Sequence, residues 1–281
     1  MGAIAQWWGK RTTWQRIVLF VVILWVIASV IFVLTRGPGP EPGIYSIPAA
    51  GGDASFITEG RDPAWSPDGS AILLTSDDEE GVPGIYVFTI GGAEATFVTN
   101  GDDPAWSPDG ESIVFAGEDA EGNVSIYTVD VAGGEAVFLT DGDSPSWSPD
   151  GTTIALSSVG VADNPGVYLF DLETNEVTFL TDGDDPAWSP DGTMIAFEGE
   201  NPNGGSDIYT IDLASAEVTF VTGGDDPTWS PDGTTIALTG AAEVGTAVYT
   251  IQPGAEAVMI SPGQAPTWSP DGSQMAVVRT E

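Results

Sequence analysis

The sequence predicts an all-β protein, a six-bladed β-propeller of four-stranded antiparallel blades, preceded by one N-terminal transmembrane α-helix. Three observations predict it: a pentapeptide that recurs, four strand-like runs in every repeat, and a repeat series that begins and ends in half a blade. The pentapeptide Trp-Ser-Pro-Asp-Gly begins at Trp65, Trp106, Trp147, Trp188, Trp229 and Trp268, at intervals of 41 residues and finally 39. Such a period is typical of repeat architectures.

The pentapeptide predicts a hairpin turn. Proline fixes φ for the second position of a type I turn, aspartate tolerates the third, and glycine takes the left-handed conformation that follows. A loop of three to five residues with glycine in that place joins antiparallel strands. The tryptophan before the turn is a large apolar anchor between neighbouring sheets. Six identical copies therefore indicate a scaffold.

Four short runs rich in β-branched and aromatic residues surround each copy. In the third repeat they are residues 146–148, 153–157, 166–170 and 177–181, each bounded by Gly, Pro, Asp or Asn. Four strands in about 40 residues form one propeller blade.

The two ends of the repeat series predict how the ring closes. It begins with only a third and a fourth strand, at residues 44–46 and 55–58, and ends with only a first and a second, at residues 266–268 and 274–278. Joined, these halves make a sixth four-stranded blade, so the sequence predicts a closed ring instead of a solenoid with polar caps.

These features together resemble a known family. The Trp-Ser-Pro-Asp-Gly hairpin, the apolar strand after it and an Ile/Val-Tyr strand look like the repeats of TolB-type six-bladed propellers. The tyrosines of that strand are Tyr45, Tyr86, Tyr127, Tyr168, Tyr209 and Tyr249. The resemblance covers about residues 43–281 and has no counterpart of the domain that TolB carries before its propeller. It implies the propeller fold, and it supports a role in protein interaction together with the rigid ring and the lack of catalytic side chains.

The composition excludes several kinds of site. The 281 residues include no Cys and no His, so disulfides, thiolate metal sites and histidine bases are excluded. The net charge is −36, with 42 acidic and 6 basic residues. A surface this acidic repels nucleic acid and attracts cations or basic partners. Adaptation to high salt and a dedicated acidic site both explain the charge, and the two are compatible.

The N-terminal region predicts a membrane anchor. Residues 1–16 form a basic, Trp-containing segment, and residues 17–35 contain an unbroken apolar run long enough to cross a bilayer as a helix. Residues 36–42 are a Pro/Gly linker to the propeller at 43–281. Basic residues before the span place the N-terminus in the cytoplasm and the propeller outside, in a single-pass protein of the cell membrane. A cleaved signal peptide is the alternative, although its apolar core would be shorter.

Acidic residues precede the innermost strand of four repeats. Asp62, Asp103, Asp185 and Asp226 each stand directly before a proline. In a closed ring they converge at one mouth of the central channel, where they repel unless a cation lies among them or some bind protons. Since Ca²⁺ prefers oxygen ligands, the four are candidate metal ligands and Ca²⁺ is the candidate cofactor. Turn formation by Asp-Pro is one alternative explanation of these residues, and binding of a basic peptide or protein is another.

Three residues break the repeat pattern. Arg61 stands where most repeats have Asp, Glu198 replaces a small or apolar residue at the end of a second strand, and Arg279 replaces a neighbouring Ser or Gly. These are candidate partner-binding residues. Drift at solvated positions is the alternative explanation.

We therefore expect a membrane-anchored, extracytoplasmic propeller that acts as a non-catalytic interaction scaffold or accessory subunit of a membrane complex. Its partners would be proteins, including other subunits of that complex. The alternative is a Ca²⁺-binding acidic surface module. A third hypothesis is a carboxylate-based glycosidase, because hydrolysis by two carboxylates needs no His, whereas a Ser-His-Asp hydrolase is excluded. The sequence contains no catalytic constellation, and we predict no enzymatic activity.

Overall fold

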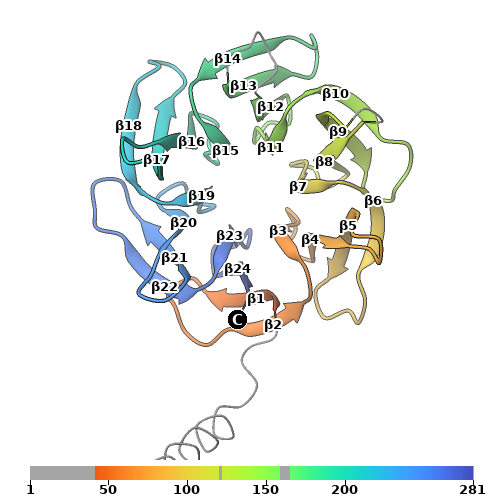
Figure 1. Cartoon of the computed structure of the whole chain (residues 1–281), viewed down its shortest axis with the longest axis horizontal. Helices are drawn as coiled ribbons and strands as arrows, with labels where there is room; N and C mark the ends of the chain where they lie inside the picture. The colour runs from red at the N-terminus through yellow and green to blue at the C-terminus, as the bar shows by residue number, and fades with distance from the viewer. Residues whose placement is uncertain (1–41, 120–121, 159–164, 281) are drawn as a thin grey trace, which may run out of the picture. The chain divides into compact units, whose positions relative to one another are not determined.

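The computed structural model describes residues 42–119, 122–158 and 165–280, which form a ring of six four-stranded antiparallel sheets around a central channel (Figure 1). The all-β six-bladed fold predicted from the repeats is confirmed. The described ranges contain no helix of the length and apolarity that a membrane crossing requires. The basic segment 1–16, the membrane helix at 17–35 and all but the last residue of the linker lie outside the described residues.

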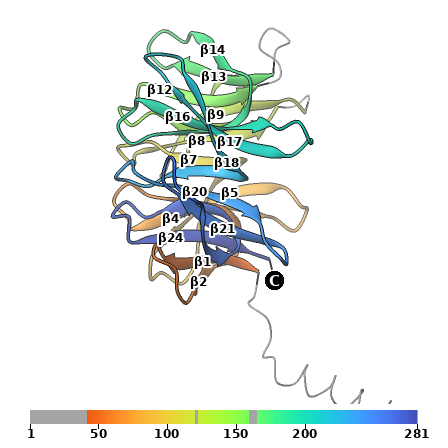
Figure 2. The same ribbon diagram turned by 90° about the vertical axis from the view of Figure 1, so that its left-hand side faces the viewer.

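Each blade runs from an innermost to an outermost strand, and Figure 2 shows the strands crossing the thickness of the disc. The first two complete blades are β3 Arg61–Trp65, β4 Ala71–Asp77, β5 Pro83–Thr89 and β6 Thr96–Asn100, then β7 Asp102–Trp106, β8 Ser112–Glu118, β9 Val124–Asp130 and β10 Val137–Asp141. The third is β11 Asp143–Trp147, β12 Thr153–Ser158, β13 Gly166–Asp171 and β14 Val177–Thr181. The fourth and fifth are β15 Asp184–Trp188, β16 Met194–Glu200, β17 Ser206–Asp212 and β18 Val218–Gly223, then β19 Asp225–Trp229, β20 Ile236–Ala241, β21 Thr246–Ile251 and β22 Val258–Pro262.

The sixth blade combines both ends of the repeat series, as the half-blades predict. Its strands are β1 Gly43–Pro48, β2 Ser55–Thr58, β23 Gln264–Trp268 and β24 Gln274–Arg279, in the order β2-β1-β24-β23. In the register of β1 against β24, Ile44 lies opposite Val278. Both side chains are buried with residues of β4, so the closing sheet shares a core with the first complete blade.

The Ser-Pro-Asp-Gly turns are built as predicted. In the first copy the Ser66 hydroxyl donates a hydrogen bond to Asp68 (2.7 Å) and accepts one from the Ala71 amide (2.9 Å). Gly69 has a φ of 71°, in the left-handed region. The serine and aspartate side chains of this motif therefore form hydrogen bonds within the turn, as such side chains often do in place of backbone groups.

The core lies between blades. Trp106, which precedes the second turn, packs with Ile113 of its own blade against Leu73 and Ile85 of the preceding blade, and its indole donates to the carbonyl of Ala64 there (3.1 Å). Burying such aromatic anchors between sheets fixes each blade on its neighbour. This rigid packing positions the inner ends of the strands around the channel.

Candidate functional site

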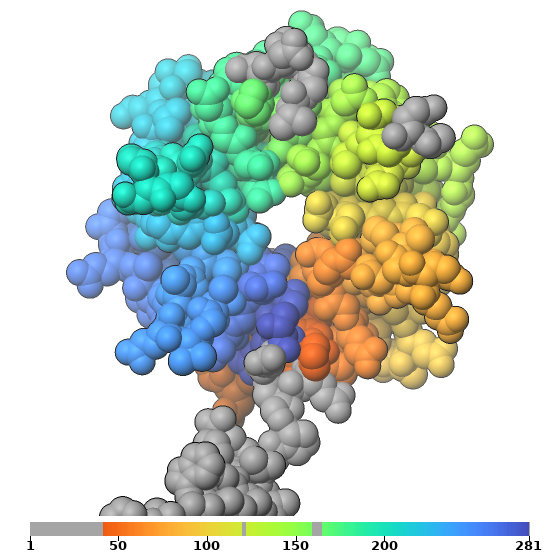
Figure 3. Space-filling view, viewed as in Figure 1, coloured from red at the N-terminus to blue at the C-terminus, as the bar shows by residue number. Residues whose placement is uncertain are grey.

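The innermost strands of the six blades surround the channel, and six residues, each before a proline, line one mouth. These mouth residues are Asp62, Asp103, Ser144, Asp185, Asp226 and Ala265, which together with the prolines enclose about 240 Å³. Figure 3 shows the opening at the centre of the ring. The structure therefore brings the four predicted aspartates together around one axis, and adds a serine and an alanine to the ring. Whether they bind a cation stays a prediction.

Every mouth residue has a left-handed backbone. The φ values are 49° at Asp62, 46° at Asp103, 46° at Ser144, 45° at Asp185, 53° at Asp226 and 47° at Ala265. Such angles are uncommon outside glycine and are most frequent in Asn and Asp, which explains the aspartates in part. The glycine two residues earlier is required by close packing, since a Cβ on Gly142 would lie 2.5 Å from the backbone oxygen of Ser157.

Hydrogen bonds between blades hold the mouth residues in place. The amide of Asp185 donates to the Ser157 hydroxyl of the preceding blade (3.0 Å), and the amide of Ala265 donates to the Thr239 hydroxyl (2.9 Å). At the equivalent position the amide of Asp226 donates to the Glu198 carboxylate (2.7 Å). Glu198 thus performs the same bridging role as the serine and threonine, but with a charged and longer side chain.

Glu198 also joins a group of three carboxylates. Oxygens of Asp185, Glu198 and Asp226 all lie within 4.8 Å of one another. Burial, together with the carboxylates of Asp185, Asp225 and Asp226, raises the pKa of Glu198 to about 8 against the lowering effect of the amide hydrogen bond. Burial likewise raises the pKa of Asp185. Such a group holds a proton or a cation near neutral pH.

A second group lies across the ring. Oxygens of Asp62, Asp102 and Asp103 lie within 4.8 Å of one another. Burial, with the neighbouring carboxylates, raises the pKa of Asp62 to about 7 and that of Asp103 to about 6. Burial and the carboxylates of Asp184 and Asp185 likewise raise the pKa of Asp143 to about 6. Asp102 and Asp143 were not singled out from the sequence, and their repeated place one residue before the mouth residues is the signal that identifies them.

Arg61 is held by the second group. Its guanidinium contacts Asp102 at 2.8 Å, Asp77 at 3.1 Å and Asp62 at 3.3 Å. We call Arg61, Asp62, Asp77, Asp102 and Asp103 the Arg61 corner. The predicted partner-binding Arg61 is therefore already paired within the chain.

Arg279 is also engaged. Its guanidinium donates to the Pro262 carbonyl (3.1 Å) and to the Ser261 hydroxyl (2.5 Å), and it lies over the Tyr45 ring at 5.2 Å from the centroid. The contacts link β24 to β22 of the neighbouring blade. The predicted use of Arg279 in partner binding is untested, but its contacts indicate a role in ring closure.

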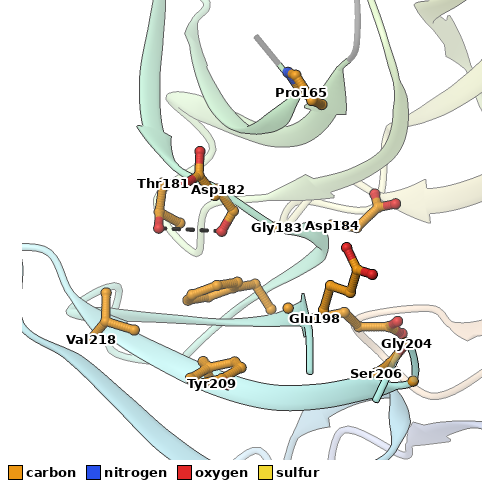
Figure 4. Close-up of a pocket in the computed structure, with 14 residues that line it drawn as sticks. Pro165, Thr181, Asp182, Gly183, Asp184, Glu198, Gly204, Ser206, Tyr209 and Val218 are labelled. Carbon is orange, nitrogen blue, oxygen red and sulfur yellow. Dashed lines mark hydrogen bonds between the residues drawn. The ribbon is translucent and has the colours of Figure 1, made fainter. Parts of the chain in front are cut away.

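A groove of about 670 Å³ opens beside Glu198 (Figure 4). The residues that line it include Phe197 and Tyr209, whose rings stack at 5.8 Å, and four acidic residues, Asp182, Asp184, Glu198 and Glu200. Figure 4 shows the carboxylate of Glu198 on the same side of the groove as that of Asp184, its partner in the β15–β16 register. The groove thus combines aromatic surface with carboxylates.

Solved structures of other proteins share this fold. A putative TolB from Agrobacterium tumefaciens is 24% identical with a TM-score of 0.74, covering 85% of this chain and 98% of that chain. TolB from Acinetobacter baumannii is 19% identical with a TM-score of 0.65, covering 88% of this chain and 65% of that chain. The TolB-like propeller fold expected from the repeats is thereby confirmed.

An enzyme structure is similar as well. Oligogalacturonate lyase in complex with manganese is 17% identical with a TM-score of 0.55, covering 84% of this chain and 77% of that chain. No family model and no curated protein matches the sequence. At these identities the likeness establishes the fold alone, since one propeller fold hosts unrelated functions.

Proposed function

We propose that the protein is a non-catalytic interaction module whose channel mouth and adjoining loops bind a basic protein partner. The observation behind the proposal is the charge of a rigid surface. Arg61 and Arg279 are the only basic residues in the part of the chain that the structure describes, and both contact groups of the same chain. The remaining carboxylates at the mouth therefore attract positive charge from outside.

The proposed setting is the outer side of a cell membrane. The apolar run at residues 17–35 would anchor the chain, with residues 1–16 in the cytoplasm and the propeller joined through the linker 36–42. A protein in this arrangement fits an accessory subunit of a membrane complex. The likeness to TolB propellers is consistent with such an interaction module.

Co-purification of the full chain in a mild nonionic detergent tests the proposal. We expect a defined protein to be retained at 50 mM salt and released at 1 M salt, because charge-dominated contacts weaken with ionic strength. A variant with Asp62→Asn, Asp103→Asn and Asp226→Asn should retain less of it, whereas exposed Glu173→Gln, on the β13–β14 turn, serves as the matched control. Recovery of the wild-type chain alone at every salt concentration would overturn the proposal.

A Ca²⁺-binding acidic module is the second candidate. The oxygens of Asp185, Glu198 and Asp226 are close enough to share one ion and supply three of the six to eight oxygens that Ca²⁺ takes. Calorimetric titration of the chelator-treated chain with Ca²⁺ tests this function. An absence of binding heat, with a melting temperature indifferent to Ca²⁺, would exclude it.

The prediction of no enzymatic activity belongs to the proposed function as well. A glycosidase needs two carboxyl groups, one protonated and one ionised. The carboxylates at the channel mouth therefore do not by themselves exclude glycoside hydrolysis. Assays against a panel of aryl glycosides test it, and turnover that Glu198→Gln abolishes would make the protein an enzyme.

A further inference from the structure

The second complete blade contains a tripeptide that the propeller repeat does not explain. Asn123-Val124-Ser125, where β9 begins, matches the acceptor pattern of N-glycosylation, which is Asn-x-Ser/Thr with x other than proline. The chain has six asparagines, and only Asn123 has a serine or threonine two residues later. Such an acceptor is typical of a surface loop in a protein that lies outside the cytoplasm.

Two departures from the repeat make this tripeptide, and both fall in the same blade. Ser125 lies opposite Gly117 in the pairing of β8 with β9. The residues at the equivalent place in the other blades have no hydroxyl; they are Gly43, Gly84, Gly166, Asp207 and Ala247. The place of Asn123 is taken by Val82, Gly205 and Gly245 in the first, fourth and fifth blades. The fold therefore requires neither the asparagine nor the serine.

The amide group of Asn123 is accessible in the finished ring. The residue is exposed, and its Nδ2 donates a hydrogen bond to the Asp119 carboxylate (2.9 Å). The backbone N–H of Asn123 donates to the other oxygen of the same carboxylate (2.8 Å). Because Nδ2 carries two hydrogens, a sugar can replace one of them while the other still donates to Asp119. The turn is therefore compatible with a glycan on this nitrogen.

Ser125, in contrast, is enclosed in the finished ring, where only 1% of its surface is exposed. It lies opposite Asp141 in the pairing of β9 with β10, and its hydroxyl donates to the Asp141 carboxylate (3.4 Å). A transferase that recognises the hydroxyl must therefore act before β9 is enclosed between β8 and β10. Modification thus precedes folding of the second blade, and folding then leaves the glycan on Asn123 in the solvent.

The surface next to Asn123 includes exposed apolar side chains. Val124 is 43% exposed and Val82, on the equivalent loop of the preceding blade, is 42% exposed. Both line a groove of about 770 Å³ between the first and second complete blades, and Asp102 and Asp103 of the Arg61 corner line it as well. A glycan is bulky and hydrophilic, so on Asn123 it would shield these valines on the face that carries the channel mouth.

We propose that Asn123 is a glycan acceptor, modified by a membrane-bound transferase that uses a sugar carried on a lipid phosphate or diphosphate. A bond forms between Nδ2 of Asn123 and the anomeric carbon of the first sugar, while the bond from that carbon to the phosphate oxygen breaks. The phosphate leaves with the bonding electron pair, and the amide proton passes to a base of the transferase. The assignment rests on the proposed function, because the acceptor must lie on the outer side of the membrane.

Peptide mass spectrometry tests the proposal on the full chain, purified in mild nonionic detergent from membranes of the cells that naturally produce it. We expect the peptide containing Asn123 to be heavier than its sequence by the mass of a chain of sugars. Asn123→Gln and Ser125→Gly should both lose the added mass completely, whereas Ser125→Thr, which keeps the acceptor pattern, should retain it. Ser125→Gly keeps the fold, because glycine holds the equivalent place in three other blades. An unmodified Asn123 in the wild type, or added mass that persists in Ser125→Gly, would overturn the assignment.

An introduced acceptor separates this assignment from the function on which it rests. Val177→Thr places a threonine two residues after exposed Asn175, on the β13–β14 turn. If Asn175 of that variant carries sugar and Asn123 does not, the assignment is wrong while the proposed outer setting stands. If Asn123 carries sugar but the wild-type chain retains no partner, the interaction function fails and the acceptor site stands. If neither asparagine is modified, the assignment is wrong, and co-purification decides the interaction function by itself.

Discussion

Replacing Glu198 by glutamine should make the propeller more stable at pH 8 and flatten the dependence of its stability on pH. Glutamine keeps an oxygen that accepts the hydrogen bond from the Asp226 amide, which is 2.7 Å from the carboxylate. It removes the charge that burial and the neighbouring carboxylates disfavour. The change therefore isolates the electrostatic cost of Glu198 from its bridging role.

The sign follows from the direction of the shift. The folded state raises the pKa of Glu198 from 4.5 to about 8, so the folded state holds its proton more tightly than the unfolded state. The resulting stability is present in full below about pH 4.5 and is lost as the pH rises through 8. The full shift corresponds to about 5 kcal/mol at 1.36 kcal/mol per pH unit. Because the mouth is open to water, screening reduces this to about 1–2 kcal/mol.

Thermal unfolding followed by tryptophan fluorescence at pH 5, 6.5 and 8, with a chelator present, measures the effect. We expect Glu198→Gln to melt about 3–6 °C above the wild type at pH 8 and close to it at pH 5. The shift follows from the expected change in the free energy of unfolding and the size of the domain. Exposed Glu173→Gln should follow the wild type at every pH. A Glu198→Gln variant that shows the wild-type slope, or melts lower at pH 8, would refute the electrostatic reasoning.

Four further predictions follow from the turns and the mouth. Gly142→Ala should lower the free energy of unfolding by more than about 2 kcal/mol, because the added Cβ would clash with the second strand of the blade. Gly204→Ala has open space around its Cβ and should lower the free energy of unfolding by about 1 kcal/mol. Urea unfolding of both variants measures the difference. Ser148→Ala should cost about 1–2 kcal/mol in the same assay, since it removes bonds to the turn carboxylate and to a strand amide, while exposed Thr152→Ala should cost less; equal losses would contradict this. Arg61→Gln should lower stability by about 1 kcal/mol at 0.1 M NaCl and by less at 2 M, and a loss that is independent of salt would argue against the ion pairs. Below pH 4 the protein should become less stable, because hydrogen bonds from Ser70 and Ser66 lower the pKa of Asp68 to about 2 in the folded state. The stability that the ionised Asp68 contributes is then lost as the pH falls through 2. A melting temperature that is unchanged between pH 4 and pH 2 would contradict this prediction.

The repeat period made most of the fold predictable. The Trp-Ser-Pro-Asp-Gly copies locate the inner hairpins, and the half-blades at residues 44–58 and 266–278 predict the sheet order that pairs β1 with β24. Such features are local in sequence and recur six times, so each copy supports the others. The convergence of Asp62 and Asp226 at one mouth followed from the ring alone.

The contacts between blades were not predictable in the same way. Arg61 was expected to face a partner, yet it pairs with Asp102, which lies 41 residues further along the chain and one blade away. Glu198 was noticed as an exception in its strand, but its bond to the Asp226 amide depends on how neighbouring blades pack. The direction in which a long side chain points between two neighbouring blades depends on how the blades pack, and the repeat pattern in the sequence does not show that packing.

The shared closing blade also affects how the protein is made. Ile44 pairs with Val278, so the ring cannot be completed until almost the whole propeller has left the ribosome. At about 5–20 residues per second that interval lasts roughly 10–50 s. During it β1 has one open edge, and Ile44 and Ile47, fully buried in the finished ring, remain exposed to water. Newly synthesised chains should therefore depend on chaperones, or on their own strong negative charge, to avoid pairing with one another before the last strand arrives.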